Sequence, residues 1–177
     1  MTCIIGLETE DGVILGADSA VTNGGECAVR RNGKIHRVSN HLIGVSGTSR
    51  VDDVIRYHTT LPRYETGSVH RHMTKVVCPA ITAAIREHFS EWNDKDIGRW
   101  YFVIGVGGSV FEVDRTGHAG HYRRGYVTAG CGSTVALGAM YATHGMPPRK
   151  RVRLALEAAA EHLDGVRAPF TIMEMKK

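Results

Sequence analysis

Three residues near the start of the chain supply a hydroxyl, a carboxylate and an ammonium at equal spacing. Asp18 follows Thr2 after sixteen residues, and Lys34 follows Asp18 after another sixteen. A threonine hydroxyl is a poor nucleophile unless a base takes its proton, and an amino-terminal threonine has such a base in its own α-amine. That amine has a pKa of about 7.7–8.0 in model peptides, so part of it is neutral near pH 7. The pattern predicts nucleophilic catalysis in which Lys34 lowers the proton affinity of the hydroxyl and Asp18 orients Lys34.

Thr2 has a free α-amine only after Met1 is removed. Removal of a starting methionine is favoured when the next side chain is small, so we expect no propeptide cleavage to be needed. A Met-Thr start has little weight alone, because many proteins without catalytic activity begin in this way. We expect the mature protein to begin at Thr2 because of the residues downstream.

Turn signals place these residues at the ends of predicted strands. The apolar runs 3–9 and 13–17 are separated by Glu10-Asp11-Gly12, and the Asp-Gly pair is a strong hairpin signal. Asn32-Gly33 predicts a further turn before a second hairpin over 34–38 and 42–45. Asp18 then closes the second strand, and Lys34 opens the third.

After residue 47 the apolar period changes from two to about 3.6, which predicts helices. A short helix is expected from about 48 to 61, where Pro62 stops it, and a longer one over 69–92. Pro79 should kink the longer helix or mark its start. The rest of the chain is expected to form a hairpin, a short strand and two helices, over 100–106 with 109–114, 126–129, 133–145 and 150–164.

Strands and helices come in pairs rather than in βαβ alternation. This order favours an α+β fold with two antiparallel sheets flanked by helices, a four-layer αββα sandwich. No linker, repeat or low-complexity segment divides the chain, so residues 1–177 are expected to form a single domain.

Composition indicates a protein of the cytoplasm without a membrane partner. Hydrophobic residues make up 42% of the chain, but none of its apolar runs approaches the roughly 18 residues of a membrane span. The start of the chain has neither the basic nor the apolar region of a signal peptide. We therefore expect cytoplasmic localisation.

Metal, nucleotide and nucleic-acid sites have no support in the sequence. The four cysteines include no CxxC pair, the ten histidines show no HExxH spacing, and no complete phosphate-binding loop is present. The net charge is +4, but the basic group at 149–151 lies in a helix-like segment and indicates a solvated face. No metal, cofactor or nucleic-acid partner is expected.

Several segments of the chain resemble the proteasome β-subunit and HslV peptidase family of N-terminal nucleophile (Ntn) hydrolases. Besides Thr2, the likeness rests on residues 16–22, 33–35, 45–47, 130–133 and 136–139. It spans nearly the whole chain, although residues 56–100 match only as a helical pair. The tail over 170–175 is similar to the C-terminal segment of HslV.

The resemblance implies roles for residues throughout the chain. Thr2 becomes the nucleophile, with Asp18 and Lys34 as its partners and the main-chain N–H of Gly47 as the oxyanion donor. Thr22 would pair with an extended substrate through its main chain. The pocket for the residue before the cut falls at Val21, Asn32, His36 and Val45, and supporting positions fall at Cys131, Ser133, Glu161 and Asp164. Cys131 departs from the serine usual in the family, Glu161 from an aspartate and Asp164 from a serine.

The function implied is a threonine-type endopeptidase that hydrolyses unfolded polypeptides inside a self-compartmentalised assembly. The resemblance implies stacked homo-oligomeric rings of roughly six or seven subunits. It also implies no cofactor for peptide hydrolysis, with ATP used only by a separate AAA+ unfoldase. Two alternatives are a catalytically silent ring subunit and an Ntn amidase that acts on small molecules.

Overall fold

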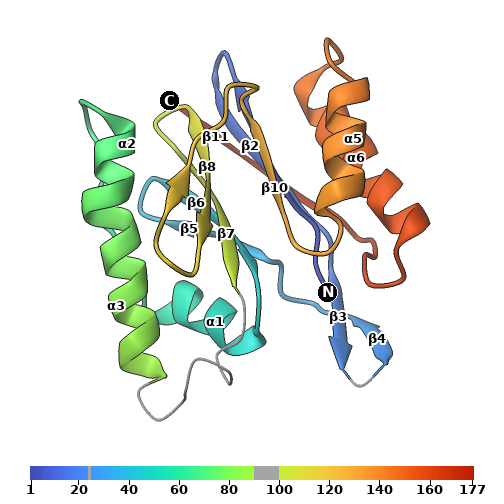
Figure 1. Cartoon of the computed structure of the whole chain (residues 1–177), viewed down its shortest axis with the longest axis horizontal. Helices are drawn as coiled ribbons and strands as arrows, with labels where there is room; N and C mark the ends of the chain where they lie inside the picture. Colours follow the sequence, from blue (N-terminus) through green and yellow to red (C-terminus); the bar gives the residue numbers. More distant parts are fainter. Residues whose placement is uncertain (24, 90–99) are drawn as a thin grey trace.

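Strand pairing divides the described chain into two large antiparallel sheets and a small hairpin (Figure 1). The computed structural model describes residues 1–23, 25–89 and 100–177. The four-stranded sheet has the order β10 (Tyr126–Ala129), β1 (Ile4–Thr9), β2 (Gly12–Ala17) and β11 (Thr171–Lys176). The five-stranded sheet consists of β5 (Ile35–Val38), β6 (His41–Ser46), β7 (Tyr101–Val106), β8 (Ser109–Asp114) and β9 (Ala119–Gly120). The hairpin pairs β3 (Ala20–Asn23) with β4 (Glu26–Val29).

Helices cover the outer faces of both large sheets (Figure 1). The five-stranded sheet is covered by α1 (Ser49–Asp53), the π-helical turn η1 (Val54–His58), α2 (Val69–His72), the π-helical turn η2 (Met73–Val77) and α3 (Cys78–His88). The four-stranded sheet is covered by α5 (Ser133–Ala142) and α6 (Pro148–His162). The described residues therefore form an α+β sandwich, as the sequence predicts.

Alternating side chains of the strands fill three apolar layers. Ile4 of β1 and Leu15 of β2 point toward the other sheet, where they pack with Val103 of β7. Ile5 of β1 points the opposite way, into the layer formed with Leu156 of α6. The third layer lies between the five-stranded sheet and α1 to α3. This alternation follows from the period of two in a β-strand and fixes the register of β1 and β2.

The predicted helices exist, but their limits and regularity differ from the prediction. The first ends at His58 rather than near residue 61, because Thr59 is already extended. The helix predicted over 133–145 ends at Ala142, ahead of Gly145 in a left-handed conformation. The helix predicted over 69–92 consists of α2, η2 and α3 up to His88, and its last predicted residues, 90–92, lie outside the described ones.

Pro79 explains the wide turn inside the long helix. Proline has no main-chain N–H, and its ring clashes with the carbonyl four residues earlier, here that of Lys75. The turn over Met73–Val77 has π-helical geometry, and α3 begins with Pro79 in its first turn. Pro79 therefore marks the start of a helical segment, one of its two predicted outcomes.

Four strands have no counterpart among the elements expected from turn signals and periodicity. β3 and β4 belong to an exposed hairpin, so no buried face marks them in the sequence. β9 has two residues. β11 is an edge strand with a half-buried pattern, so periodicity does not mark it and only the family resemblance points to its segment. None of the helices in the described part of the chain is long and apolar enough to cross a membrane.

Gly16 allows α6 to approach β2 closely. A Cβ at this position would overlap Cγ1 of Val152 and lie 3.1 Å from Cδ1 of Leu156. We expect Gly16→Ala to lower the free energy of unfolding by about 1–3 kcal/mol through overpacking. The double variant with Val152→Ala should be more stable than the sum of the two single effects predicts.

The matched control is Gly138→Ala on the exposed face of α5, where a Cβ meets no atom within 4 Å. This variant should gain about 0.5–1 kcal/mol from helix propensity. Urea unfolding is measured for the parent protein and the four variants Gly16→Ala, Val152→Ala, their combination and Gly138→Ala. If Gly16→Ala is as stable as Gly138→Ala, the close approach of α6 to β2 is wrong.

Candidate active site

Lys34 lies between a threonine hydroxyl and a carboxylate. Its Nζ is 3.2 Å from Oγ1 of Thr2 and 2.7 Å from Oδ1 of Asp18. Thr2 is 7% exposed, Lys34 3% and Asp18 0%. The structure thus brings the three residues of the sixteen-residue spacing into one buried cluster.

The ends of three strands bring these side chains together. β1 and β2 are antiparallel, with Ile4 opposite Ala17, so the residues just outside that pair lie at one end of the sheet. Asp18 donates its N–H to the carbonyl of Cys3 at 3.2 Å and thereby extends the pairing toward Thr2. Lys34 precedes β5 and reaches the same point from the facing sheet. The site therefore depends on how the two sheets face each other.

The Asp18 carboxylate is held by four donors. Oδ1 accepts from Lys34 and from the N–H of Cys3 at 2.9 Å, and Oδ2 accepts from the N–H groups of Ala20 at 2.8 Å and Arg167 at 3.4 Å. Bonds to an ionised acceptor are about twice as strong as neutral ones. Asp18 consequently holds the Lys34 ammonium in one position beside Thr2.

Burial opposes the charge on Lys34. Desolvation lowers the pKa of its ammonium below the ordinary value of 10.5, while the neighbouring Asp18 carboxylate works in the opposite direction. The positive charge of Arg30 lowers the pKa further. Lys34 is therefore a cation that loses its proton more readily than a lysine on the surface.

Residues 130–132 surround the main chain of Thr2. The N–H of Thr2 points at Sγ of Cys131 at 3.3 Å, and the N–H of Gly132 donates to the Thr2 carbonyl at 3.1 Å. Gly130 has a φ of +96°, and a Cβ there would overlap that same carbonyl oxygen. Glycine at 130 is thus required by both conformation and space.

Met1 fills the space in front of Thr2. Its carbonyl oxygen accepts from the Thr2 hydroxyl at 2.6 Å and from Nζ of Lys34 at 3.3 Å. Its amino group donates to Oγ1 of Thr22 at 2.9 Å, and its side chain lies on Gly165. With Met1 in place the nitrogen of Thr2 is part of a peptide bond and cannot act as a base.

The predicted substrate-binding residues divide into exposed and buried groups. Asn32 is exposed, whereas Val21 and Thr22 are half-buried on β3. His36 and Val45 are buried, and Val45 donates its N–H to the carbonyl of Lys34 at 2.9 Å. Asn32 and His36 flank Lys34 in the chain, and Val45 pairs with it.

Gly47 is exposed and follows the last residue of β6. That last residue is Ser46, and a Cβ on Gly130 would lie 3.2 Å from its Oγ. Gly47 therefore follows a residue that lies beside residues 130–132, which contact the main chain of Thr2.

The four predicted supporting residues are not equally close to Thr2. Cys131 touches its main chain, and Ser133 begins α5, with its carbonyl accepting from Oγ1 of Thr128 at 3.2 Å. Glu161 and Asp164 are exposed. Oδ1 of Asp164 lies 4.0 Å from Nη2 of Arg167. In the described part of the chain, neither acid has a polar contact with Thr2, Asp18 or Lys34.

Glu161 and Asp164 are expected only as supporting positions, and the residue of this region that contacts the cluster is Arg167, through its main chain. Its N–H donates to Oδ2 of Asp18, while its Nε donates to the carbonyl of Asp164 at 3.1 Å. The loop after α6 therefore turns the main chain toward the cluster and the side chain of Asp164 toward solvent.

Sequence reasoning missed a second buried carboxylate, Asp52 of α1. Its Oδ1 lies 2.6 Å from Nε2 of His36, and its Oδ2 forms a salt bridge with Arg30. Although burial opposes ionisation, His36 and Arg30 hold the pKa of Asp52 below its ordinary value. Asp52 thereby holds both ends of the segment 30–36, which contains Lys34, in place.

Arg56 adds a further contact between the helices and the segment 30–36. Its Nη2 donates to the carbonyl of Gly33 at 2.8 Å and lies 3.9 Å from Asp52. The spacing of four between Asp52 and Arg56 is typical of a helical ion pair and is the one signal in the sequence that points to Asp52. The contact of Asp52 with His36 has no such signal, because it joins a helix to a strand.

The arrangement is suited to activating a hydroxyl rather than to binding a metal. An ammonium beside Oγ1 of Thr2 stabilises negative charge on that oxygen, and the carboxylate behind it keeps the ammonium in place. Among residues 1–23, 25–89 and 100–177, no group of three or more His, Cys, Asp or Glu side chains is placed to hold a metal ion.

Comparison with known sequences identifies relatives among proteasome subunits. The sequence model of the family described as proteasome subunit matches residues 1–172. Proteasome subunit beta 2 of Nitrosopumilus maritimus is 29% identical over 143 residues, which cover 77% of this chain and 65% of that protein. Proteasome subunit beta type-1 of Saccharomyces cerevisiae is 31% identical over 150 residues, which cover 77% and 63%. The chain spans less than two thirds of the length of these relatives.

Solved structures show the same fold at lower sequence identity. The protein called BPH from Thiobacillus denitrificans superposes with a TM-score of 0.76 at 23% identity, covering 98% of this chain and 97% of that one. HslV from Trypanosoma brucei superposes with a TM-score of 0.71 at 19% identity, covering 99% of each chain.

The Asp52 contacts predict a loss of stability when its charge is removed. Asp52→Asn leaves Arg30 and His36 without their anion and should lower the free energy of unfolding by about 2 kcal/mol. This value is below that of a fully buried pair because the Arg30 side chain is 20% exposed. The matched control is Asp53→Asn, the same change at the next residue, which has no salt bridge in the described part of the chain. Urea unfolding that shows equal stability for both variants contradicts the anchoring role.

Proposed function

The chain belongs to the proteasome subunit family, and from that premise we propose that it is a threonine-type endopeptidase whose nucleophile is Thr2. The observation that carries the proposal is the position of the Lys34 ammonium, 3.2 Å from the Thr2 hydroxyl and 2.7 Å from Asp18. The proposal requires removal of Met1, whose carbonyl now accepts a hydrogen bond from the Thr2 hydroxyl. Removal frees the α-amine that takes up this proton during attack.

The reaction is an acyl transfer in two stages. Oγ1 of Thr2 attacks the carbonyl carbon of the substrate, and its proton passes to the α-amine of the same residue. The C–N bond then breaks, the leaving amine takes a proton, and the acyl group remains on Thr2 as an ester. Water, deprotonated by the same α-amine, cleaves the ester and restores the hydroxyl. Lys34 stabilises the oxygen of Thr2 as negative charge develops on it.

Main-chain groups hold the substrate and its oxyanion. The N–H of Gly47, an exposed residue just after β6, donates to the oxygen of the tetrahedral intermediate. The substrate lies extended against Thr22 of β3 and pairs with its main chain. Val21, Asn32, His36 and Val45 line the pocket for the residue before the cut. Asp52 keeps the His36 ring in one orientation there.

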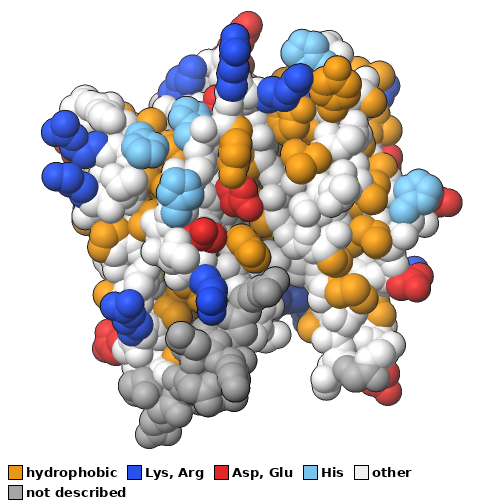
Figure 2. Space-filling view, viewed as in Figure 1, with side chains coloured by type: hydrophobic (Ala, Val, Ile, Leu, Met, Phe, Trp, Pro, Cys, Tyr) orange, Lys and Arg blue, Asp and Glu red, His pale blue; other side chains and the backbone are white. Residues whose placement is uncertain are grey.

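The peptidase works as a homo-oligomeric ring that encloses its sites. The shared fold of HslV and proteasome subunits supports ring assembly in this family. Figure 2 shows hydrophobic side chains gathered over α5, and three large ones there or just beyond it are exposed: Leu137 by 43%, Tyr141 by 61% and Met146 by 43%. Exposed apolar patches of this kind mark interaction surfaces. We assign this face to contacts between copies of the chain.

The assembly has roughly six or seven subunits per ring and receives unfolded polypeptides from a separate AAA+ unfoldase. Peptide hydrolysis itself needs no cofactor, and ATP is used by the unfoldase. The enzyme acts in the cytoplasm.

Hydrolysis of fluorogenic peptides by the purified protein tests the proposal. Thr2→Ala should abolish activity, and Lys34→Ala should reduce kcat/KM by at least about 100-fold, because the charge beside Oγ1 is lost. Lys150→Ala is the matched control on the exposed surface of α6 and should retain full activity. A large assembly without any hydrolysis would instead indicate a silent ring subunit, and a monomer that cleaves only small amides would indicate an amidase.

The pH dependence follows from the lowered pKa of Lys34. The ammonium is the activating form of Lys34, so activity is lost as pH rises through the pKa of Lys34 in the folded protein. Because burial lowers that pKa, the alkaline fall of kcat/KM should lie below pH 10.5. Lys34→Arg should remove this alkaline fall from whatever activity it retains, since a guanidinium stays charged. An unchanged alkaline limb in Lys34→Arg would show that another group titrates.

A further inference from the structure

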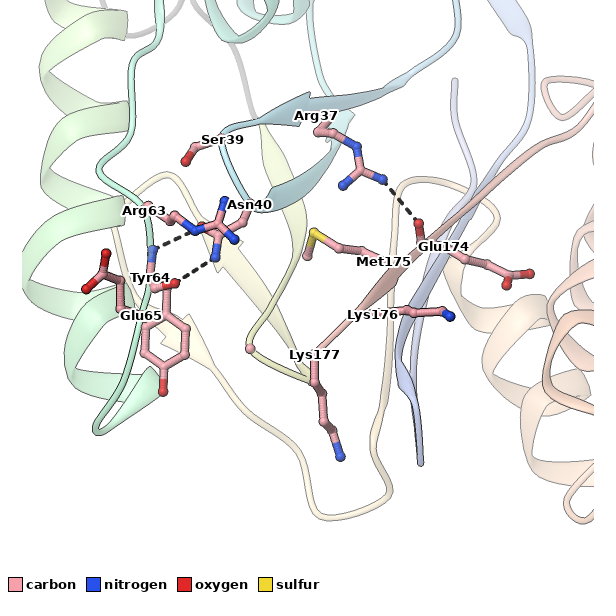
Figure 3. Close-up of a pocket in the computed structure, with 11 residues that line it drawn as sticks. Arg37, Ser39, Asn40, Arg63, Tyr64, Glu65, Glu174, Met175, Lys176 and Lys177 are labelled. Atoms are coloured by element: carbon pink, nitrogen blue, oxygen red, sulfur yellow. Dashed lines mark hydrogen bonds between the residues drawn. The ribbon is translucent and has the colours of Figure 1, made fainter.

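A basic groove lies at the end of the molecule away from Thr2. It consists of two cavities of about 690 and 770 Å³ that share Arg63, Tyr64 and Glu65. The first cavity extends from there to the turn between β5 and β6 and to the end of β11, as Figure 3 shows. The second continues over residues 66–68 to the faces of α2 and η2. We refer to the two cavities together as the basic groove.

Positive side chains dominate the walls of the basic groove. Six cations line it against two carboxylates, Glu65 and Glu174; the cations are Arg37, Arg63, Arg71, Lys75, Lys176 and Lys177. Figure 2 shows Lys and Arg side chains both over α2 and at the end of the molecule where the C-terminus lies. Positive charges remain in excess even when an α-carboxylate on Lys177 is counted.

Neither carboxylate neutralises these cations. Oε1 of Glu174 pairs with Arg149, outside the groove, at 2.7 Å. Figure 3 shows the Glu65 side chain directed away from Arg37 and Glu174. Arg37 donates to the main-chain oxygen of Glu174 at 3.2 Å, and the other five cations form no salt bridge within the described residues. The groove therefore presents unpaired positive charge.

The loop that forms the middle of the groove is held in place before any ligand binds. Nδ2 of Asn40 donates to the carbonyl of Tyr64 at 2.7 Å, and Oδ1 of Asn40 accepts the N–H of Tyr64 at 3.0 Å (Figure 3). The Tyr64 ring packs against Gly107, where an added Cβ would lie only 2.6 Å from Cε1 of Tyr64. The Tyr64 hydroxyl donates to the carbonyl of Gly67 at 2.7 Å. A site formed in advance loses less entropy on binding.

The floor of the second cavity is also fixed. Nε2 of His72 is 2.9 Å from Nε2 of His41, whose Nδ1 contacts the carbonyl of Val38 at 3.2 Å. Burial, with His72 beside it, lowers the pKa of His41 to about 4. His41 is therefore neutral near pH 7, and the pair holds α2 against the sheet without a buried charge.

The shape and lining of the groove suit an extended peptide better than a single small anion. The two cavities run from η2 to the end of β11, so the cations are spread along a path and do not converge on one point. Apolar atoms of Tyr64, Met175 and Val76 lie between them. The neighbouring strand β11 is a sheet edge, which suits a main chain lying alongside it.

We propose that the basic groove is a docking site for an extended acidic peptide segment of a partner protein, separate from the peptidase site. Lys176 pairs with Gly12 at one end of β2, whereas Asp18 follows Ala17 at the other end. Gly12 and Asp18 are six residues apart, or roughly 20 Å at the rise of a β-strand. None of the residues that line the groove belongs to the Thr2 site. A bound segment would leave the nucleophile accessible.

Fluorescence anisotropy tests the proposal with a short labelled peptide in which glutamate alternates with leucine. The Thr2→Ala variant serves as the parent protein, so that cleavage of the peptide cannot interfere and the result does not depend on peptidase activity. We expect binding that weakens with salt and that falls about tenfold with Arg63→Glu. Lys150→Glu makes the same charge change on exposed α6 and should alter affinity by less than about twofold.

Three results would overturn the docking site. Equal weakening by Arg63→Glu and Lys150→Glu would show attraction by net charge alone. Equal binding of a peptide with glutamine in place of glutamate would remove the role of the cations. Tighter binding of a single-stranded oligonucleotide of the same charge would assign the groove to nucleic acid. Arg63 is exposed and forms no salt bridge in the described part of the chain, so Arg63→Glu should keep its thermal midpoint.

Discussion

The buried contact between Lys34 and Asp18 is the interaction on which the rest of the site depends. Removing two opposite charges from water is costly unless their geometry is good and their remaining hydrogen-bonding capacity is used. Asp18 meets this condition because three main-chain N–H groups and the Lys34 ammonium surround its two oxygens. The result is a positive charge fixed beside the Thr2 hydroxyl in a place with little solvent.

The layers of the sandwich act together to hold that contact. The chain leaves the four-stranded sheet at Asp18, passes through the β3–β4 hairpin and enters the five-stranded sheet just after Lys34. Asp52 on α1 fixes the returning segment, and residues 130–132 at the start of α5 fix the main chain of Thr2. Helices on both outer faces thus contribute to a site that lies between the sheets.

Features with a local cause could be predicted from the sequence, and features that depend on packing could not. The Asp-Gly turn and the alternation of apolar residues indicate the β1–β2 hairpin, and the family resemblance with the spacing of Thr2, Asp18 and Lys34 indicates the cluster. The bond from Arg167 to Asp18 uses a main-chain N–H, which every residue except proline has, so no residue type signals it. His36 and Asp52 meet only because α1 packs beside β5. The exposure of Asp164 likewise follows from the path of the loop after α6, and Glu161 is exposed because it lies on the outward face of α6.

We propose that Thr2, once it is the first residue, is the group that attacks. The most direct test is the mass of the intact protein after reaction with a β-lactone, followed by peptide mapping of the adduct. We expect a chain that begins at Thr2 and carries one lactone on that residue, with no adduct in Thr2→Ala. An adduct on the exposed thiol of Cys131, or intact Met1 on protein that still hydrolyses peptides, would contradict this proposal.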